Sequence, residues 1–224
     1  MTRIHVICEG QTEEAFVKEV LQPGFSRKGI FLFPSLIGRP GHKGGNVSFD
    51  RAFRDIKLRL SSDRTSYCTT FFDYYGIDTD FPGRAGAQSL WSAEQKSQHV
   101  HAEFARHVCA KLQGVADVAG RFIPYIQMYE FEGLLFACPR RFATGIGQPS
   151  LQGDLQAIRA AFPHPEAIND SVHTAPSKRV NGLCAGYQKP LHGVLAALEI
   201  GAEDLRQECR LFHEWLSRLE ALAP

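Results

Sequence analysis

Short apolar runs that alternate with helix-like segments constrain the fold of this chain more than any other feature. Runs of apolar and β-branched residues at 3–8, 30–37, 67–72 and 122–128 have the length and composition of buried strands. The segments between them, such as 48–60, carry apolar residues at helical spacing. This alternation is typical of a mostly parallel sheet with helices on its faces. The sequence therefore predicts an α/β fold.

The pattern changes after about residue 149, where the strand-like runs end. Three later segments, at 151–162, 190–198 and 205–222, have helical spacing. A length of 224 residues suggests one domain, or one domain with an elaborated tail. We therefore predict an α/β core over residues 1–148. A helical C-terminal extension over residues 149–224 packs on this core and forms one compact unit with it.

Composition and charge exclude several classes of protein. The chain has 25 Lys and Arg against 24 Asp and Glu, so a uniformly basic nucleic-acid-binding surface is not expected. Its apolar runs are much shorter than the roughly 20 residues that cross a membrane, so we expect no membrane association. The six cysteines are scattered without a C-x-x-C pair, which argues against a zinc site and is typical of reduced cytoplasmic thiols.

Acidic residues follow three of the predicted strands at their carboxyl ends. Glu9 follows the first run, Asp73 follows the third, and Glu130 and Glu132 follow the fourth. Open α/β sheets bind ligands at this edge, and Mg²⁺ prefers oxygen ligands. The sequence therefore predicts that Glu9, Asp73 and Glu132 bind Mg²⁺ or Mn²⁺. Glu13 joins these three as a fourth candidate catalytic residue.

A structural explanation of the same acids stays open. Thr12 is a candidate helix cap, and Glu13 and Glu14 fall in the first helical turn, where the helix dipole favours carboxylates. This helix is predicted to stop at 23–24, a Pro-Gly pair. Asp73 precedes a glycine turn, a common place for Asp. Three acidic strand ends in one sheet nevertheless favour a shared site.

A second candidate site lies at 174–179, where the sequence reads Thr-Ala-Pro-Ser-Lys-Arg. Four of its side chains are donors suited to a phosphate group: Thr174, Ser177, Lys178 and Arg179. The same segment could instead begin a helix with Ser177 as its cap. A glycine-rich segment at 38–45 adds Arg39 and Lys43 as further basic residues.

Three histidines, His99, His101 and His107, lie on a polar helix predicted over residues 92–112. No two of them have the i,i+4 spacing of a helical zinc pair. We therefore expect all three to lie on a solvated helix face. P-loop and dinucleotide-binding glycine patterns are also absent from the sequence.

The segment Glu9-Gly10-Gln11-Thr12-Glu13 resembles the E-G-x-T-E start of Toprim-type domains. These domains form the metal-binding fold of primases, topoisomerases and overcoming-lysogenization-defect nucleases. The chain is more closely similar to the domain-of-unknown-function 4276 family, whose landmarks resemble the segments at 72–76, 81–83, 129–136 and 168–179. The resemblance covers roughly residues 3–216 and implies a Toprim-like core.

The Toprim-type resemblance implies roles by position. Glu9 matches a first-strand glutamate that acts as a metal ligand or general acid/base. Asp73 matches the first acid of a D-x-D pair, but Tyr75 stands where the second acid is expected. This departure weakens a two-metal mechanism. Three other acids are candidates to replace the missing one: Glu132, Glu130 and Asp80.

Three functional hypotheses follow from the sequence. The resemblance implies a metal-dependent nuclease or phosphoryl-transfer enzyme acting on nucleic acid, in an anti-phage or mobile-element system beside an ATPase of the ABC or SMC type. The missing second acid favours the alternative of a non-catalytic Toprim-like subunit that binds such an ATPase or nucleic acid. In the third hypothesis the acids are helix and turn caps only.

Overall fold

A computed structural model describes residues 1–38, 46–169 and 171–223, so most of the predicted basic segment at 38–45 lies outside the described residues. The described strands form one five-stranded sheet: β1 (Thr2–Cys8), β2 (Ile30–Leu36), β3 (Tyr67–Asp73), β4 (Phe122–Ile123) and β5 (Ile126–Gln127). The order is β2-β1-β3-β4, β5 also pairs with β3, and every pair is parallel. The predicted α/β fold with a mostly parallel sheet is confirmed.

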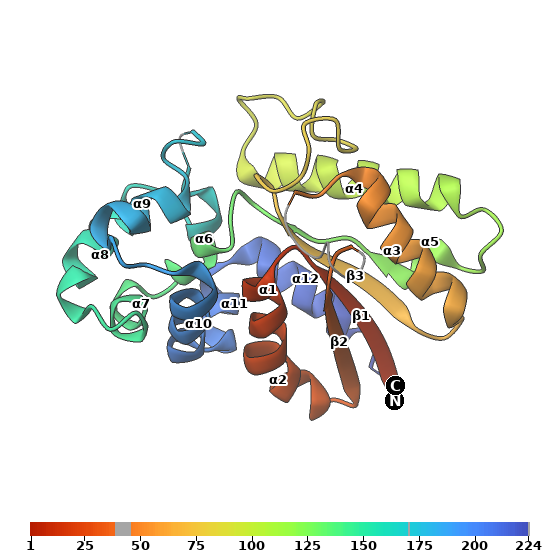
Figure 1. Cartoon of the computed structure of the whole chain (residues 1–224), viewed down its shortest axis with the longest axis horizontal. Helices are drawn as coiled ribbons and strands as arrows, with labels where there is room; N and C mark the ends of the chain where they lie inside the picture. The colour runs from red at the N-terminus through yellow and green to blue at the C-terminus, as the bar shows by residue number, and fades with distance from the viewer. Residues whose placement is uncertain (39–45, 170, 224) are drawn as a thin grey trace.

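Helices cover both faces of this sheet (Figure 1). Three helices pack with the core of one face: α3 (Phe49–Ser62), α4 (Ala93–Lys111) and α5 (Val118–Arg121). The other face is covered by α1 (Gln11–Phe16), η1 (Val17–Leu21), α2 (Gln22–Ser26) and α12 (Arg210–Glu220). The sheet is therefore buried on both sides, as its continuous apolar strands require.

Two prolines explain where the strands differ from the predicted runs. The run predicted at 122–128 is interrupted at Pro124, which lacks the N–H that a ladder needs, so it forms two short strands instead of one. Pro34 lies inside β2, which is tolerated because β2 is an edge strand.

The first helical region does not stop at its Pro-Gly pair. After α1 the chain forms a π-helical turn, η1, and continues into α2 as far as Ser26. Pro23 is the second residue of α2, directly after the π-helical turn η1, and the chain stays helical through it. The predicted end at 23–24 was therefore wrong.

After β5 all described elements are helical, and most of them gather to one side of the sheet (Figure 1). They are α6 (Glu132–Leu135), α7 (Pro139–Gly145), η2 (Pro149–Leu151), α8 (Gln152–Ala160), η3 (Pro165–Ala167), α9 (Pro176–Leu183), η4 (Lys189–Gly193), α10 (Val194–Ile200) and α11 (Ala202–Glu208). Among the described residues, no helix has both the length and the apolar character needed to cross a membrane.

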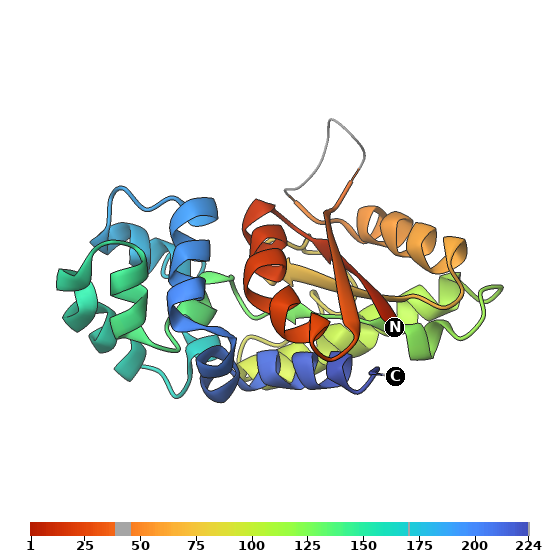
Figure 2. The same ribbon diagram turned by 90° about the horizontal axis from the view of Figure 1, so that it is seen from below.

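The last helix, α12, returns to the sheet. Trp215 stacks on Tyr125 with ring centroids 4.2 Å apart, and its Nε1 donates to Thr69 Oγ1 at 2.8 Å. Thr2 Oγ1 donates to the Leu222 carbonyl at 2.8 Å, so the two ends of the chain lie side by side (Figure 2). The C-terminal helix therefore belongs to the same core as the first strand.

Candidate functional site

The carboxyl ends of β1 and β3 bring Glu9 and Asp73 together. Glu9 follows β1, and its Oε2 accepts the backbone N–H of Asp73, the last residue of β3, at 2.9 Å. The Glu9 carboxylate also lies against the backbone of Gly76. A Cβ at position 76 would stand 2.1 Å from Glu9 Oε2, so only glycine fits beside the carboxylate as it lies. The turn after β3 is therefore shaped around Glu9.

Glu13 serves the start of α1 and also faces the same edge. Its Oε2 accepts the Gly10 N–H at 2.9 Å, which is the half of a capping box that does not need a side chain at the N-cap. Its other oxygen, Oε1, is buried and has no hydrogen-bond partner within the described residues. The structural and the functional explanations of Glu13 are therefore compatible, because each uses a different oxygen.

A tight turn at Tyr129 follows β5 and precedes two acids, Glu130 and Glu132, which have different partners. Tyr129 has a positive φ of 62°, an uncommon conformation for a bulky residue. Glu130 then accepts the Ser177 N–H at 2.7 Å through Oε2. Glu132 lies in the first turn of α6, is fully buried, and its Oε1 accepts the Tyr187 hydroxyl at 3.5 Å.

Lys189 stands at the centre of these acids. Its Nζ lies 2.7 Å from Asp73 Oδ2, 3.4 Å from Glu13 Oε1 and 3.4 Å from Glu132 Oε2. It is the first residue of η4, a turn that packs against α1. We call the four carboxylates of Glu9, Glu13, Asp73 and Glu132 the acidic centre. Lys189 is its counter-cation.

No local sequence pattern identifies Lys189. The residue follows Asp73 by 116 positions and stands alone before a predicted helix, so neither spacing nor periodicity distinguishes it from a surface lysine. Tyr187, the donor to Glu132, was missed for the same reason. Only the fold shows that η4 lies against the carboxyl edge of the sheet.

Negative charge exceeds positive charge in the acidic centre. Burial raises the pKa of Glu9 to about 7, and burial likewise raises the pKa values of Asp73 and Glu132. Burial alone would lower the pKa of Lys189, but Asp73, Glu132 and Glu13 together raise it well above its ordinary value. One ammonium therefore faces four carboxylates, and the site favours bound protons or a further cation.

The donor set of the acidic centre fits a hard divalent cation. Three buried carboxylate oxygens have no hydrogen-bond partner: Glu13 Oε1, Asp73 Oδ1 and Glu132 Oε2. Oxygen ligands of this kind suit Mg²⁺ or Mn²⁺. As the side chains stand, however, no three Asp, Glu, His or Cys residues in the described ranges are arranged to hold a metal ion. The carboxylates surround an ammonium, and their oxygens would have to move to share an ion.

The segment predicted to bind phosphate is placed beside the acidic centre but is partly engaged in local contacts. Thr174 Oγ1 accepts the Ser171 N–H at 2.9 Å, and Arg179 Nε donates to the Thr174 carbonyl at 2.7 Å. Ser177 is not a helix cap, because α9 begins at Pro176 and the Ser177 N–H is held by Glu130. Lys178 is exposed.

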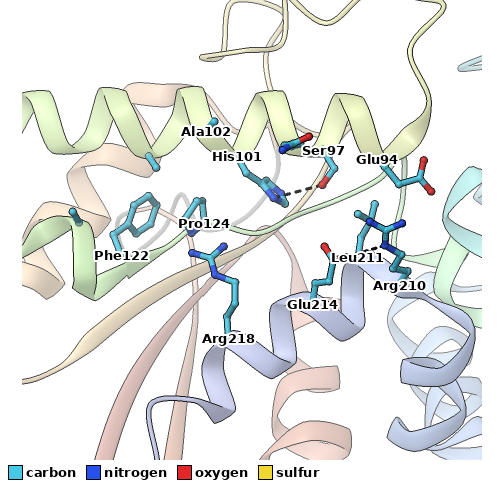
Figure 3. Close-up of a pocket in the computed structure, with 13 residues that line it drawn as sticks. Glu94, Ser97, His101, Ala102, Phe122, Pro124, Arg210, Leu211, Glu214 and Arg218 are labelled. Atoms are coloured by element: carbon cyan, nitrogen blue, oxygen red, sulfur yellow. Dashed lines mark hydrogen bonds and ion pairs between the residues drawn. The ribbon is translucent and has the colours of Figure 1, made fainter.

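A pocket of about 440 Å³ lies between α4 and α12 and includes no residue of the acidic centre (Figure 3). His101 lines it, contrary to the expectation of a solvated helix face. Its Nε2 accepts the Ile126 N–H at 2.8 Å, and burial lowers its pKa to about 4. His101 is therefore a neutral side chain that joins α4 to β5.

The fold and the site define an α/β protein with a buried acidic centre at the carboxyl edge of a parallel sheet. The chain belongs to the family described as a domain of unknown function, DUF4276, whose model matches residues 8–220. This match spans the acidic centre and Lys189. Comparison with curated proteins and with solved structures gave no match. The Toprim-type resemblance has no support from these comparisons and stays a prediction.

Proposed function

We propose that the acidic centre binds Mg²⁺ or Mn²⁺ and that the protein hydrolyses phosphodiester bonds in nucleic acid. One observation carries the proposal: carboxylates from three separate strand ends meet at one point and present buried oxygens that have no hydrogen-bond partner. Among the described residues, Asp73 Oδ1 has no hydrogen-bond partner, while Glu13 Oε1 and Glu132 Oε2 each lie 3.4 Å from the Lys189 ammonium without a hydrogen bond. Buried oxygens satisfied this weakly are costly unless a ligand binds them. The E-G-x-T-E resemblance supports the same chemistry.

The ligands in this proposal are the oxygens that make no hydrogen bond in the described part of the chain: Asp73 Oδ1, Glu132 Oε2 and Glu13 Oε1. A bound divalent ion would supply an activated water and stabilise negative charge on the phosphate. Glu9 fixes the end of β3 through the Asp73 N–H and places a fourth carboxylate beside the ligands. The capping contact of Glu13 fixes the first turn of α1 in the same way.

The proposal assigns substrate binding to the segment at 174–179. Glu130 accepts the Ser177 N–H and its charge acts on both Glu9 and Glu132, so the start of α9 adjoins the acidic centre. Lys178 and Arg179 are basic residues of this segment, and lysine and arginine are the usual partners of backbone phosphates. We propose that they hold the phosphates that flank the scissile bond.

The cellular setting is part of the same proposal. All six cysteines fall within the described residues as free thiols, and burial raises the pKa of Cys8, Cys68 and Cys209. Reduced, unreactive thiols fit a cytoplasmic protein. An anti-phage or mobile-element role with an ABC- or SMC-type ATPase partner rests on the Toprim-type resemblance alone.

A second candidate function is a non-catalytic subunit that binds a partner ATPase or nucleic acid. The observation that favours it is the position of Lys189, whose ammonium already forms ion pairs with Asp73, Glu13 and Glu132. In that case the acidic centre would be a structural ion-pair network, and divalent ions would not bind it.

A cleavage assay separates the two functions. Single- and double-stranded DNA and RNA are incubated with the protein in Mg²⁺, in Mn²⁺ and in EDTA, with and without the partner ATPase. We expect divalent-dependent cleavage that falls by about 100-fold or more in Asp73→Asn. Asp50→Asn is the matched control, because the side chain of Asp50 is 80% exposed. An Asp73→Asn protein that cleaves like the wild type would overturn the enzymatic proposal, and absence of cleavage under all conditions would favour the subunit.

A further inference from the structure

We infer that Lys189 is a built-in substitute for the divalent cation, which holds the acidic centre together without metal and must leave when the ion binds. The inference rests on the proposed function, because it concerns the affinity of the same site. It goes beyond that function by assigning Lys189 the role of setting how tightly the centre binds its ion.

The hydrogen bonds of the carboxylates divide into two sets. On the outer side, Glu9 accepts the Asp73 N–H, Glu13 accepts the Gly10 N–H, and Glu132 accepts the Tyr187 hydroxyl. These contacts need no cation. On the inner side, the Lys189 ammonium is the positive charge that Asp73, Glu13 and Glu132 share. Outer contacts therefore hold three of the four carboxylates, and Lys189 pairs with the fourth, Asp73, and compensates the charge at the centre.

A divalent ion and the ammonium cannot occupy this centre together. Lys189 Nζ lies 3.4 Å from both Glu13 Oε1 and Glu132 Oε2, two of the oxygens assigned to the ion, so it occupies the space that the ion would need. Two cations about 4 Å apart also repel each other strongly where water is scarce. Binding of the ion therefore requires the ammonium to withdraw, and the cost of breaking its contacts lowers the apparent affinity for the ion.

The position of Lys189 in the chain allows such a withdrawal. A third of its side chain is exposed, whereas the side chains of Glu132, Glu13 and Asp73 are at most 6% exposed. Lys189 begins η4, a single π-helical turn, and Gln188 before it is exposed. The lysine side chain therefore reaches the centre from the surface and can return there by rotating about its own bonds. Glu9, Glu13 and Glu132 keep their outer contacts while it does so.

The first test measures Mn²⁺ binding by isothermal titration calorimetry in wild type, Lys189→Met and Lys18→Met. Methionine keeps the length of the lysine stem without its charge. Lys18 is the matched control, because it is a half-exposed lysine paired with Glu14 on the neighbouring helix and away from the centre. We expect Lys189→Met to bind Mn²⁺ about tenfold more tightly than wild type, or tighter still, and Lys18→Met to bind as wild type does.

The outcomes separate the inference from the proposed function. If the wild type binds Mn²⁺ as tightly as Lys189→Met does, or more tightly, the inference is overturned but the proposed metal site stands. If neither protein binds Mn²⁺ at millimolar concentration, the metal site and the inference both fail. The melting temperature gives a second readout. If Mn²⁺, relative to EDTA, raises the melting temperature of Lys189→Met by more than it raises that of the wild type, the inference is supported.

The second test uses the wild type alone and does not depend on how the variant folds. The protein is treated briefly with an amine-acetylating reagent in EDTA or in Mn²⁺, and the modified lysines are identified by mass spectrometry. We expect Lys189 to be protected in EDTA and modified several-fold faster in Mn²⁺, while Lys57, exposed on α3, reacts equally in both. Equal protection of Lys189 in both conditions would show that the ammonium does not leave and would overturn the inference.

Discussion

In the acidic centre, Glu9 and Glu13 each stabilise the local backbone and also contribute a carboxylate oxygen to the site. Glu9 and Glu13 each use one oxygen to accept a backbone N–H, which fixes a strand end or a helix start, and each leaves its second oxygen for the centre. The cap and the metal ligand are therefore not competing explanations at residue scale. A backbone contact holds one oxygen of each of these carboxylates in place without a ligand, so it is the second oxygen that has to adjust when an ion binds.

Gly76 tests this account of Glu9. In Gly76→Ala the new Cβ would overlap the Glu9 carboxylate, which must then give up the Asp73 N–H. We expect the free energy of unfolding to fall by about 1–3 kcal/mol, the cost of an unpaired buried donor. Urea denaturation measures this change. The matched control is Gly182→Ala in α9, where a Cβ meets no atom within 4 Å.

The same substitution has a second, stricter test. Because the effect of Gly76→Ala passes through Glu9, the double variant Gly76→Ala with Glu9→Ala should be no less stable than Glu9→Ala alone. Independent, additive losses of stability in the double variant would contradict the account.

At the scale of elements, α4 is attached to β5 by a histidine that must stay neutral. His101 Nε2 accepts the Ile126 N–H, and a protonated ring could not do so. The pKa of His101 is about 4 in the folded chain, below its ordinary value of 6.5. The unfolded chain therefore takes up the proton first as the pH falls, and stability is lost between pH 6.5 and 4.

His101→Gln removes this titration and keeps an acceptor for the Ile126 N–H. We expect wild type to lose about 2–3 kcal/mol of stability relative to His101→Gln when the pH falls from 7 to 4. Denaturant unfolding at several pH values gives the difference. His99→Gln on the same helix serves as the control and should follow the wild type. Parallel stability curves for wild type and His101→Gln would refute this assignment.

The strands and helices themselves were largely predictable, because their signals are local. The apolar runs predicted the strands, and Ser92 with Gln95 forms the capping box that starts α4. The break at Pro124 and the π-helical turn η1 were not predicted, since they depend on how the sheet and its neighbours pack. Lys189 was missed because its contacts span 116 residues, and no local pattern encodes a contact at that range.

At the scale of the whole molecule, the C-terminal helix completes the core that the first strand begins. Trp215 is buried, stacks on Tyr125 and donates to Thr69 in β3. Phe71 in the same strand also packs against the tryptophan ring, 5.3 Å between centroids. The last helix of the extension predicted from residue 149 onward therefore covers the sheet, and we expect the core to be destabilised when this contact is lost.

Trp215→Ala tests this dependence. Removing the ring opens a cavity against β3, and we expect the free energy of unfolding to fall by about 3–5 kcal/mol in a urea titration. Leu198→Ala is the control, because Leu198 is 47% exposed on α10 and its loss should cost less than about 0.5 kcal/mol. Similar losses for both variants would mean that α12 is not part of the central core.

The central claim, that the acidic centre is a divalent-cation site held by Lys189 in the absence of metal, is tested most directly by crystals grown in Mn²⁺. Anomalous diffraction at the manganese edge locates the ion without ambiguity. The account predicts a peak about 2.1–2.3 Å from oxygens of Asp73, Glu13 and Glu132, with the Lys189 ammonium moved away from Asp73. Crystals saturated with Mn²⁺ that show no peak there, and Lys189 still paired with Asp73, would contradict it.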